Sequence, residues 1–482
     1  MGDVRGIFLI NGVFAVMLAA AMLIPAAVDL VAGNPDYQVF LAAAAVTAFI
    51  GGGMTVTCWQ RGIRLSLRAA FVLTTSVWLL LPSFAALPFV FATLELSYTD
   101  AFFEAMSGLT TTGATVIVGL DRAPPGILIW RAILQWLGGV GIIVTAIAVL
   151  PLLQVGGMQL FRMESSESSD KALPRAAQIA GATALIYLVL TAACTLVLWQ
   201  TGFSPFDAVA HAMTTVATGG FSTRDASVGG FANPAAEWTI ILFMVLGSLP
   251  FVLYLQAVRG RPLALWRDTQ VRWFFITLTG LLAGALLLTD LLHLQSVTDA
   301  IRMALFNVIS VMTGTGYATD DYGQWGRAAT VLFFFTMFIG GCAGSTSCGI
   351  KIFRFRVMFE NARVQINELI RPNAVMVPRF NGRPIEAHVI EAVMSYFFLF
   401  AMVFGTLAFL LTVTGLDLTT ALSGAATAVA NVGPGLGDII GPTGNFQPLP
   451  EPAKWLLSLG MLLGRLELFT VLVLFTPRFW TT

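Results

Sequence analysis

The sequence predicts an all-α integral membrane protein with four internal repeats. Only 11% of its 482 residues are charged and 57% are hydrophobic, whereas about 25% of the residues of a soluble globular domain are charged. Apolar runs of about 20 residues, long enough to cross a bilayer as a helix, recur along the whole chain. Four loops rich in glycine and threonine follow shorter apolar segments at similar intervals, which indicates a repeated unit.

Ten apolar runs are long enough to span a membrane. The first, from Ile7 to Val28, is longer than the roughly 7–15 apolar residues of a secretory signal, so we interpret it as an uncleaved helix. Shorter apolar segments flanked by spans are typical of re-entrant elements. The ten runs are centred near residues 18, 48, 80, 140, 186, 245, 281, 340, 400 and 464, and the shorter segments are 100–112, 207–219, 299–315 and 418–432.

The charges orient the predicted spans. Basic residues gather in the loops of one side, and an excess of Lys and Arg marks the cytoplasmic side. The short segments then face outward, and both termini are cytoplasmic. The basic residues are Arg61, Arg64, Arg68, Arg162, Lys171, Arg175, Arg259, Arg261, Arg267, Arg272, Arg354, Arg356, Arg363, Arg371, Arg379 and Arg383. The acidic residues of the other side are Asp29, Asp36, Glu95, Asp100, Asp207, Asp225, Glu237, Asp320, Asp321, Asp417 and Asp438.

Each short segment runs directly into a loop with a central glycine. Successive central glycines are separated by 107, 96 and 117 residues, and Asp100 and Asp207 each precede their own glycine by 13 residues. This spacing leaves room for two spans and one short helix in every repeat. The loops are Thr111-Thr112-Gly113, Thr218-Gly219-Gly220, Gly314-Thr315-Gly316 and Asn431-Val432-Gly433.

These twelve loop residues suit a filter for a monovalent cation. Rings of backbone carbonyls can replace the hydration shell of K⁺, and glycine allows the backbone conformations that such a strand needs. The partly negative C-terminal ends of the short helices would favour a cation. The alternative is that the glycines serve only close helix packing. We expect Glu104 and His211, each nine residues before its glycine, to hydrogen-bond to their surroundings rather than to bind the ion.

A second glycine-rich segment interrupts the run near residue 340. Glycine costs about 1 kcal/mol relative to alanine in a helix, so this segment cannot hold a stable helix. We predict a flexible plug below the third loop; a kink for close helix crossing is the alternative. The predicted gate residues are Gly340, Gly341, Ala343, Gly344, Ser345, Thr346, Ser347, Gly349, Lys351 and Arg465.

Arg465 is expected in the middle of the last apolar span. A charge there costs at least about 2.5 kcal/mol and is normally functional or paired. Glu467 lies two residues further on, roughly 200° around a helix, and is therefore a poor partner. We predict that Arg465 points into the pore and binds carbonyl groups of the plug.

The motifs resemble those of the Trk/Ktr/HKT superfamily, in particular its TrkH branch. The resemblance rests on the four loops, on the stretch from Gly340 to Lys351 and on Gly464-Arg465-Leu466-Glu467. It implies four span–pore helix–filter–span repeats around a pseudo-fourfold pore in one subunit, with two extra N-terminal transmembrane helices. Cys348 departs from the pattern, since relatives often carry glycine there. Gly113 agrees with potassium selectivity, since sodium-preferring relatives often have serine at this position.

The resemblance also implies a function. It implies potassium uptake across the bacterial inner membrane, with K⁺ as the transported ion and Rb⁺ left open as a second one. It further implies a homodimer and a cytoplasmic nucleotide-binding regulatory subunit of TrkA type. Uptake would be driven by the ion gradient, because the chain has no GxxxxGK[ST] motif for ATP. Channel behaviour and symport coupled to H⁺ or Na⁺ both stay open.

We expect five units along the chain. They are an N-terminal two-helix domain (1–66) and four pore repeats (67–160, 161–262, 263–372 and 373–482), of which the third carries the gating loop. The basic segment 354–383 could dock the regulatory partner or simply enforce topology.

Other classes of function fit less well. The three histidines are far apart, the four cysteines have no CxxC pair, and the formal net charge is zero, so we expect no enzyme, no covalent cofactor and no nucleic-acid partner. A secondary transporter with broken helices would have two inverted halves, whereas all four interruptions here share one side.

Overall fold

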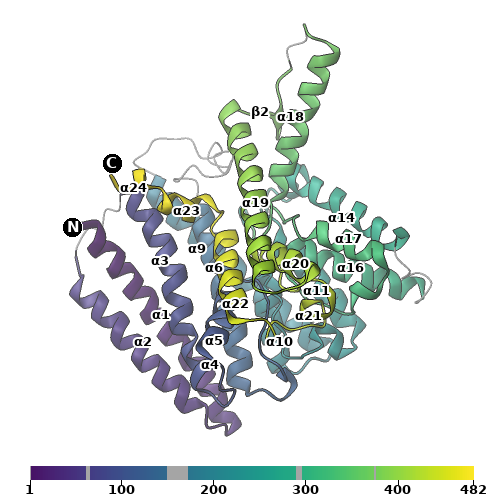
Figure 1. Ribbon diagram of the computed structural model, residues 1–482. Helices are drawn as coiled ribbons and strands as arrows, with labels where there is room; N and C mark the ends of the chain where they lie inside the picture. The colour runs from purple at the N-terminus through teal and green to yellow at the C-terminus, as the bar shows by residue number, and fades with distance from the viewer. Residues whose placement is uncertain (1, 61–65, 149–171, 289–295, 374–375, 482) are drawn as a thin grey trace.

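The structure is a computed structural model that describes residues 2–60, 66–148, 172–288, 296–373 and 376–481. Figure 1 shows a helical protein in which α1, α2 and α3 stand together at the N-terminal side and α18 and α19 project beyond the other helices. Arg61, Arg64, Arg162, Lys171 and the predicted boundary between residues 160 and 161 lie outside the described residues.

Helices form most of the described chain. In its first half they are α1 (Gly2–Ala32), α2 (Tyr37–Thr57), α3 (Leu67–Ala85), α4 (Leu87–Phe91), α5 (Tyr98–Leu109), α6 (Pro125–Ala148), α9 (Ala172–Gln200), α10 (Pro205–Val216), α11 (Pro234–Ser248) and α12 (Phe251–Val258). In its second half they are α13 (Ala264–Arg267), α14 (Thr269–Leu288), α16 (Val297–Thr313), α17 (Arg327–Thr336), α18 (Ile352–Ile370), α19 (Ala387–Val413), α20 (Leu418–Ala430), α21 (Gly437–Ile440), α22 (Glu451–Arg465), α23 (Phe469–Leu472) and α24 (Pro477–Thr481).

Short 3₁₀ turns and one small hairpin complete the described chain. The hairpin is a small local addition to the mainly helical fold. Its strands β1 (Arg379–Phe380) and β2 (Arg383–Pro384) pair antiparallel, with Phe380 opposite Arg383. Asn381 and Gly382 between them both have positive φ, as a two-residue hairpin turn requires. The 3₁₀ turns are η1 (Leu120–Arg122), η4 (Ser227–Phe231), η5 (Tyr322–Gln324) and η6 (Val473–Phe475).

Seven helices within the described ranges are long and apolar enough to cross a membrane. Two further candidates are bent pairs: α11 and α12 meet at 93°, and α22 and the α23–η6 segment meet at 107°. The predicted spans near residues 245 and 464 are therefore bent pairs of helices and not single straight helices. The predicted interruption of the run near 340 is confirmed, because α17 ends at Thr336 and the next long helix starts at Ile352.

The two bends have local causes. Pro250 follows α11 and has no N–H to continue the helix. The carbonyls of Gly247 and Ser248 instead accept from the amides of Thr346 and Cys342, at 3.2 and 3.0 Å. After α22, Glu467 and Leu468 have positive φ, which ends a right-handed helix.

The four short apolar segments form α5, α10, α16 and α20. Each begins at a side chain that accepts a hydrogen bond from a backbone amide of the first turn, as a helix N-cap does. Ser97, Ser204 and Ser296 accept from the amides of Asp100, Asp207 and Asp299, and Asp417 accepts from that of Thr420. A helix of 12 to 17 residues is roughly 18 to 26 Å long. This is shorter than the hydrocarbon core of a bilayer, which is about 30 Å thick.

Candidate functional site

The four loops after these helices share one backbone conformation. The central glycine has positive φ in every loop, and so does the residue two positions before it. A β-branched residue rarely adopts positive φ, yet Thr111 and Thr218 do so here. The φ values are 52° and 86° for Thr111 and Gly113, 51° and 77° for Thr218 and Gly220, 72° and 81° for Gly314 and Gly316, and 52° and 112° for Asn431 and Gly433.

One backbone hydrogen bond also recurs in all four loops. The amide just before the central glycine donates to the carbonyl five residues earlier, in the last turns of the short helix. The pairs are Thr112 to Ser107 at 2.9 Å, Gly219 to Thr214 at 2.8 Å, Thr315 to Ser310 at 2.8 Å and Val432 to Thr427 at 3.0 Å. The loops are thus structural equivalents despite their different sequences.

The four loops meet in a closed ring. A Cβ atom on each central glycine would come within 3.0 Å of a carbonyl oxygen of the next loop, which real Cβ atoms essentially never do. The oxygen always belongs to the residue just before the next central glycine. The contacts run from Gly113 to Gly219, from Gly220 to Thr315, from Gly316 to Val432 and from Gly433 to Thr112. Eight of the twelve predicted filter residues make these contacts, and the other four stand one position before them in the same loops.

Buried polar side chains of the short helices form hydrogen bonds with residues that follow the loops. Glu104 is fully buried, forms an ion pair with Arg131 at 2.7 Å and accepts from the Val116 amide at 2.9 Å. His211 is also fully buried, and its Nε2 lies 3.0 Å from Ser222 Oγ. The expectation that Glu104 and His211 hydrogen-bond to their surroundings is confirmed.

The position nine residues before the third central glycine also holds a buried polar side chain. Asn307, nine residues before Gly316, donates through Nδ2 to Thr319 Oγ1 at 2.9 Å. Sequence reasoning missed this residue, although its spacing from the glycine equals that of Glu104 and His211.

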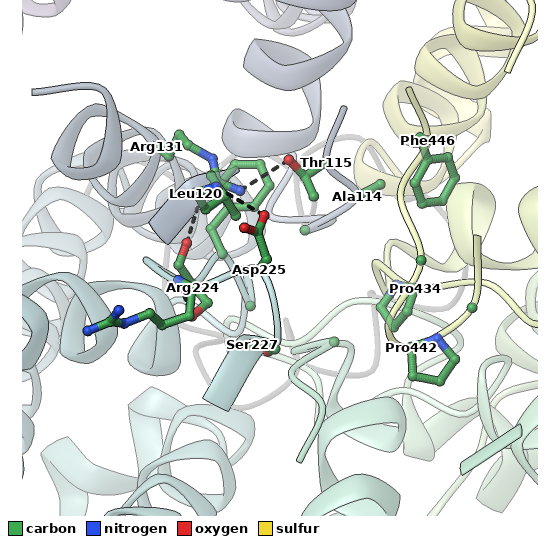
Figure 2. Close-up of a pocket in the computed structure, with 17 residues that line it drawn as sticks. Ala114, Thr115, Leu120, Arg131, Arg224, Asp225, Ser227, Pro434, Pro442 and Phe446 are labelled. Carbon is green, nitrogen blue, oxygen red and sulfur yellow. Dashed lines mark hydrogen bonds between the residues drawn. The ribbon is translucent and has the colours of Figure 1, made fainter. Parts of the chain in front are cut away.

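A vestibule opens at the ring. Its lining includes Gly113, Gly220 and Gly316, and Figure 2 shows Pro434, Pro442 and Phe446 across the opening from Arg131 and Arg224. Arg224 donates to Asp121 Oδ1 at 3.0 Å, and this hydrogen bond lowers the pKa of the exposed Asp121 carboxyl. The pair ties the segment after the first loop to the segment after the second.

The predicted gating segment, Gly340–Lys351, lies against the C-terminal ends of two short helices. Thr346 Oγ1 donates to the carbonyl of Val216, the last residue of α10, at 3.0 Å. Ser347 Oγ donates to the carbonyl of Thr313, the last residue of α16, at 2.6 Å. Thr111 Oγ1 is 3.6 Å from Cys348 Sγ. The segment therefore contacts the residues that precede the central glycines, whereas the vestibule is lined by residues from the glycines onward.

The whole gating segment is buried or nearly so. Gly340, Gly341, Ala343, Ser345, Thr346, Ser347 and Lys351 are buried, and Gly344 and Gly349 are half-buried. Non-helical backbone at membrane depth is tolerated where protein buries it or where it lines a water-filled cavity.

Arg465 reaches this segment from the end of α22. Its side chain is 2% exposed. Nη1 donates to the carbonyl of Thr346 at 3.4 Å and contacts Cys348 Sγ, while Nη2 donates to the carbonyl of Gly138 at 3.0 Å. Arg465 is the last residue of α22 and lies at the bend of the α22 and α23–η6 pair, not inside one continuous helix as the prediction assumed.

Glu467 pairs with Arg354 of α18. The angle of about 200° between Glu467 and Arg465 assumed one continuous helix and was wrong, since Glu467 has left the helix with a φ of 60°. Arg354 also stacks over the Tyr396 ring, with its Cζ atom 3.7 Å from the ring centre. Lys351 donates to the carbonyl of Ser347. Three buried basic side chains, of Lys351, Arg354 and Arg465, thus lie in or next to the gating segment.

A further ion pair links α22 to α5. Lys454 of α22 donates to Asp100 Oδ1 at 2.5 Å and to the carbonyl of Gln447 at 2.9 Å. Sequence reasoning missed Lys454, although a lysine in an apolar helix is an unusual feature.

No structural metal site or disulfide accompanies this arrangement in the part of the chain that the structure describes. In that part, no three His, Cys, Asp or Glu side chains gather to hold a metal ion. Cys58, Cys194, Cys342 and Cys348 are free thiols.

Comparison with known proteins identifies the family. The family model TrkH, described as cation transport protein, matches residues 36–481. The chain belongs to this family. This TrkH-family chain is 48% identical over 465 residues to the Trk system potassium uptake protein TrkI of Halomonas elongata, covering 96% of this chain and 94% of that protein. It is 39% identical over 489 aligned positions to the Trk system potassium uptake protein TrkH of Escherichia coli K12, covering 99% of each.

A solved structure has the same fold as this TrkH-family chain. The crystal structure of the potassium transporter TrkH from Vibrio parahaemolyticus superimposes with a TM-score of 0.91, at 37% sequence identity and with 99% of each chain covered. The relatives are named as transporters and not as enzymes. The chain is therefore a multi-pass membrane transport protein of mainly helical fold.

Proposed function

We propose that this protein takes up potassium through a pore that the ring of four loops forms. The observation that carries the proposal is the ring itself: each central glycine lies against the carbonyl oxygen that precedes the central glycine of the next loop. Such a ring concentrates backbone oxygens around one axis. Backbone oxygens of this kind can replace the hydration shell of K⁺. The printed names of the relatives, which are potassium uptake proteins and a potassium transporter, support the choice of ion.

The proposed architecture follows the four loops. Four span–pore helix–filter–span repeats, over 67–160, 161–262, 263–372 and 373–482, surround a pseudo-fourfold pore, and the two N-terminal helices of residues 1–66 stand outside it. The shared N-caps, backbone angles and loop hydrogen bonds support this division. Four helix C-termini, with their partial negative charge, would then face the ion path.

The proposed gate is the segment from Gly340 to Lys351, held by Arg465. Its hydrogen bonds to the ends of α10 and α16 and the guanidinium beneath it support a closed conformation. A buried positive charge in the path repels a cation. Opening would require the segment to leave the helix ends, and we assign that control to a cytoplasmic nucleotide-binding partner of TrkA type.

The proposed setting is the bacterial inner membrane. Both termini would lie in the cytoplasm, and the protein would act as a homodimer. Each K⁺ that enters gains about 2.3 kcal/mol per 100 mV of membrane potential, so the gradient alone can drive uptake, with or without coupled H⁺ or Na⁺.

Purified protein in liposomes tests the function. We expect uptake of radiolabelled Rb⁺ that falls when unlabelled K⁺ is added outside and falls much less when Na⁺ is added. Uptake that K⁺ and Na⁺ suppress equally, or no uptake above that of empty liposomes with the partner and nucleotide present, would contradict the proposal.

A further inference from the structure

The second loop differs from the other three at the residue before its central glycine. That position holds Gly219, whereas the other loops have Thr112, Thr315 and Val432 there. In the first and third loops this threonine pairs with a second threonine two residues earlier, at the end of the short helix. Thr112 Oγ1 lies 2.8 Å from Thr110 Oγ1, and Thr315 Oγ1 lies 2.8 Å from Thr313 Oγ1.

Gln135 of α6 occupies the space beside Gly219. A Cβ atom on Gly219 would come within 3.0 Å of the Gln135 side-chain amide. Gln135 is fully buried. Its Nε2 donates to the carbonyl of Gly219 at 2.5 Å, and its Oε1 accepts from the amide of Phe221 at 2.9 Å. The amide thus holds the backbone on both sides of Gly220, from a helix of the preceding repeat.

Arg131 supports the same loop one turn earlier on α6. Residues four apart lie on one face of a helix. Arg131 Nη1 donates to the carbonyl of Ser222 at 2.7 Å, and its guanidinium stacks over the Phe221 ring, with Cζ 4.0 Å from the ring centre. Its Nε is fixed by the buried Glu104, so the first repeat anchors the arginine. Figure 2 shows Arg131 beside Thr115 of the first loop and next to the segment that carries Arg224.

The hydrogen bond from Gln135 to Gly219 ends on an atom of the ring. The carbonyl oxygen of Gly219 is the atom that packs against Gly113 of the first loop. A carbonyl oxygen has two lone pairs, so it can accept from Gln135 and still present a lone pair elsewhere. The hydrogen bond therefore fixes the direction of a carbonyl that lies between two loops.

We infer that Gln135, supported by Arg131, is a positioning residue that sets the cation preference of the pore through the Gly219 carbonyl. This inference rests on the proposed function. The Gln135 side chain comes from the neighbouring repeat. Its hydrogen bonds stabilise the second loop, as the threonine pairs stabilise the first and third loops. Without it the second loop gains freedom, and a looser ring discriminates less between a larger and a smaller monovalent cation.

The first test measures the ratio of K⁺ to Na⁺ flux in liposomes for the full-length Gln135→Met variant. Methionine keeps the volume of the side chain and removes both hydrogen bonds. We expect the ratio to fall by about fivefold or more, since two buried backbone groups lose their partner. An unchanged ratio in a folded variant would overturn the inference, even if the total flux fell.

Thr191→Val is the matched control. Thr191 of α9 accepts from Trp136 Nε1 at 3.1 Å and donates to the carbonyl of Tyr187 at 2.9 Å, so the variant also loses buried hydrogen bonds beside α6. Neither of these hydrogen bonds involves a loop residue, and we expect the native K⁺ to Na⁺ ratio. A fall equal to that of Gln135→Met would mean that any loss of packing near α6 changes selectivity, and would also overturn the inference.

The second test combines a larger residue at position 219 with a smaller one at position 135. It tests the inference even if the Gln135→Met variant does not fold. Gly219 is not among the glycines with positive φ, so its backbone can carry a side chain once Gln135 is shortened. We expect Gly219→Ser alone to lower the flux ratio and the double variant Gly219→Ser with Gln135→Ala to restore part of it. A double variant no more selective than Gly219→Ser would overturn the inference. Failure of the native protein to prefer K⁺ would instead refute the proposed function, so the two failures are distinguishable.

Discussion

Replacing Arg465 by alanine removes the main contact between α22 and the gating segment. The guanidinium donates to the carbonyls of Thr346 and Gly138, at 3.4 and 3.0 Å, and contacts Cys348 Sγ. A hydrogen bond from a charged group contributes about 1.5–3 kcal/mol. The bond to Thr346 is long and counts for little, and the bond to Gly138 joins α22 to α6, so the contact with Cys348 Sγ provides most of the link to the gating segment. Arg465→Ala should therefore destabilise the closed segment by about 2 kcal/mol, which raises the ratio of open to closed states by about thirtyfold.

The assay is K⁺-dependent flux into liposomes without the regulatory partner. We expect a rise of about tenfold or more, because loss of the buried charge also lowers the electrostatic barrier to a cation. Ser458→Ala is the control, since this buried serine of α22 donates only to the carbonyl of Lys454 within its own helix, at 2.9 Å. Unchanged or lower flux in a folded Arg465→Ala protein would refute the reasoning, because the arginine would then not hold a closed gate.

Three other outcomes are expected. Deleting Ala343–Ser347 removes the bonds to the ends of α10 and α16 and should raise liposome flux; loss of the folded protein with no gain in flux would favour a simple kink. Gly113→Ser should lower the K⁺ to Na⁺ flux ratio, since a Cβ at this positive φ collides with the second loop, and an unchanged ratio would show that the ring does not select. Asp100→Asn leaves Lys454 buried without its charge partner and should cost about 3 kcal/mol of stability. Thermal unfolding in detergent should show a partial recovery when Lys454→Met is added, and no recovery would contradict a role for the ion pair.

The repeat could be read from the sequence because its signals are local. A serine or aspartate N-cap, a short apolar helix and a glycine two residues after a positive-φ position are all set within about 20 residues. Hence the four short helices and the four loops lie where composition and spacing placed them. Asn307 escaped notice only because Asn, Glu and His look unrelated until their common spacing from the glycine is seen.

The end of α22 could not be read in this way. Leucine and glycine around Arg465 fit a continuous span, and nothing local predicts the 107° bend. At the turn Glu467 pairs with Arg354, a residue 113 positions earlier, and that pairing belongs to the folded chain alone.

The sequence by itself determined the class of protein, the number of loops and the residues at their centres, because hydropathy, helix capping and glycine content act over short stretches. Only the tertiary structure decided the order in which the loops meet, the carbonyl that each glycine contacts and the side chains that brace them. Gln135 carries no motif, and its amide finds Gly219 only because α6 packs behind the second loop. Contacts of this kind join residues 84 positions apart, and no local preference encodes them.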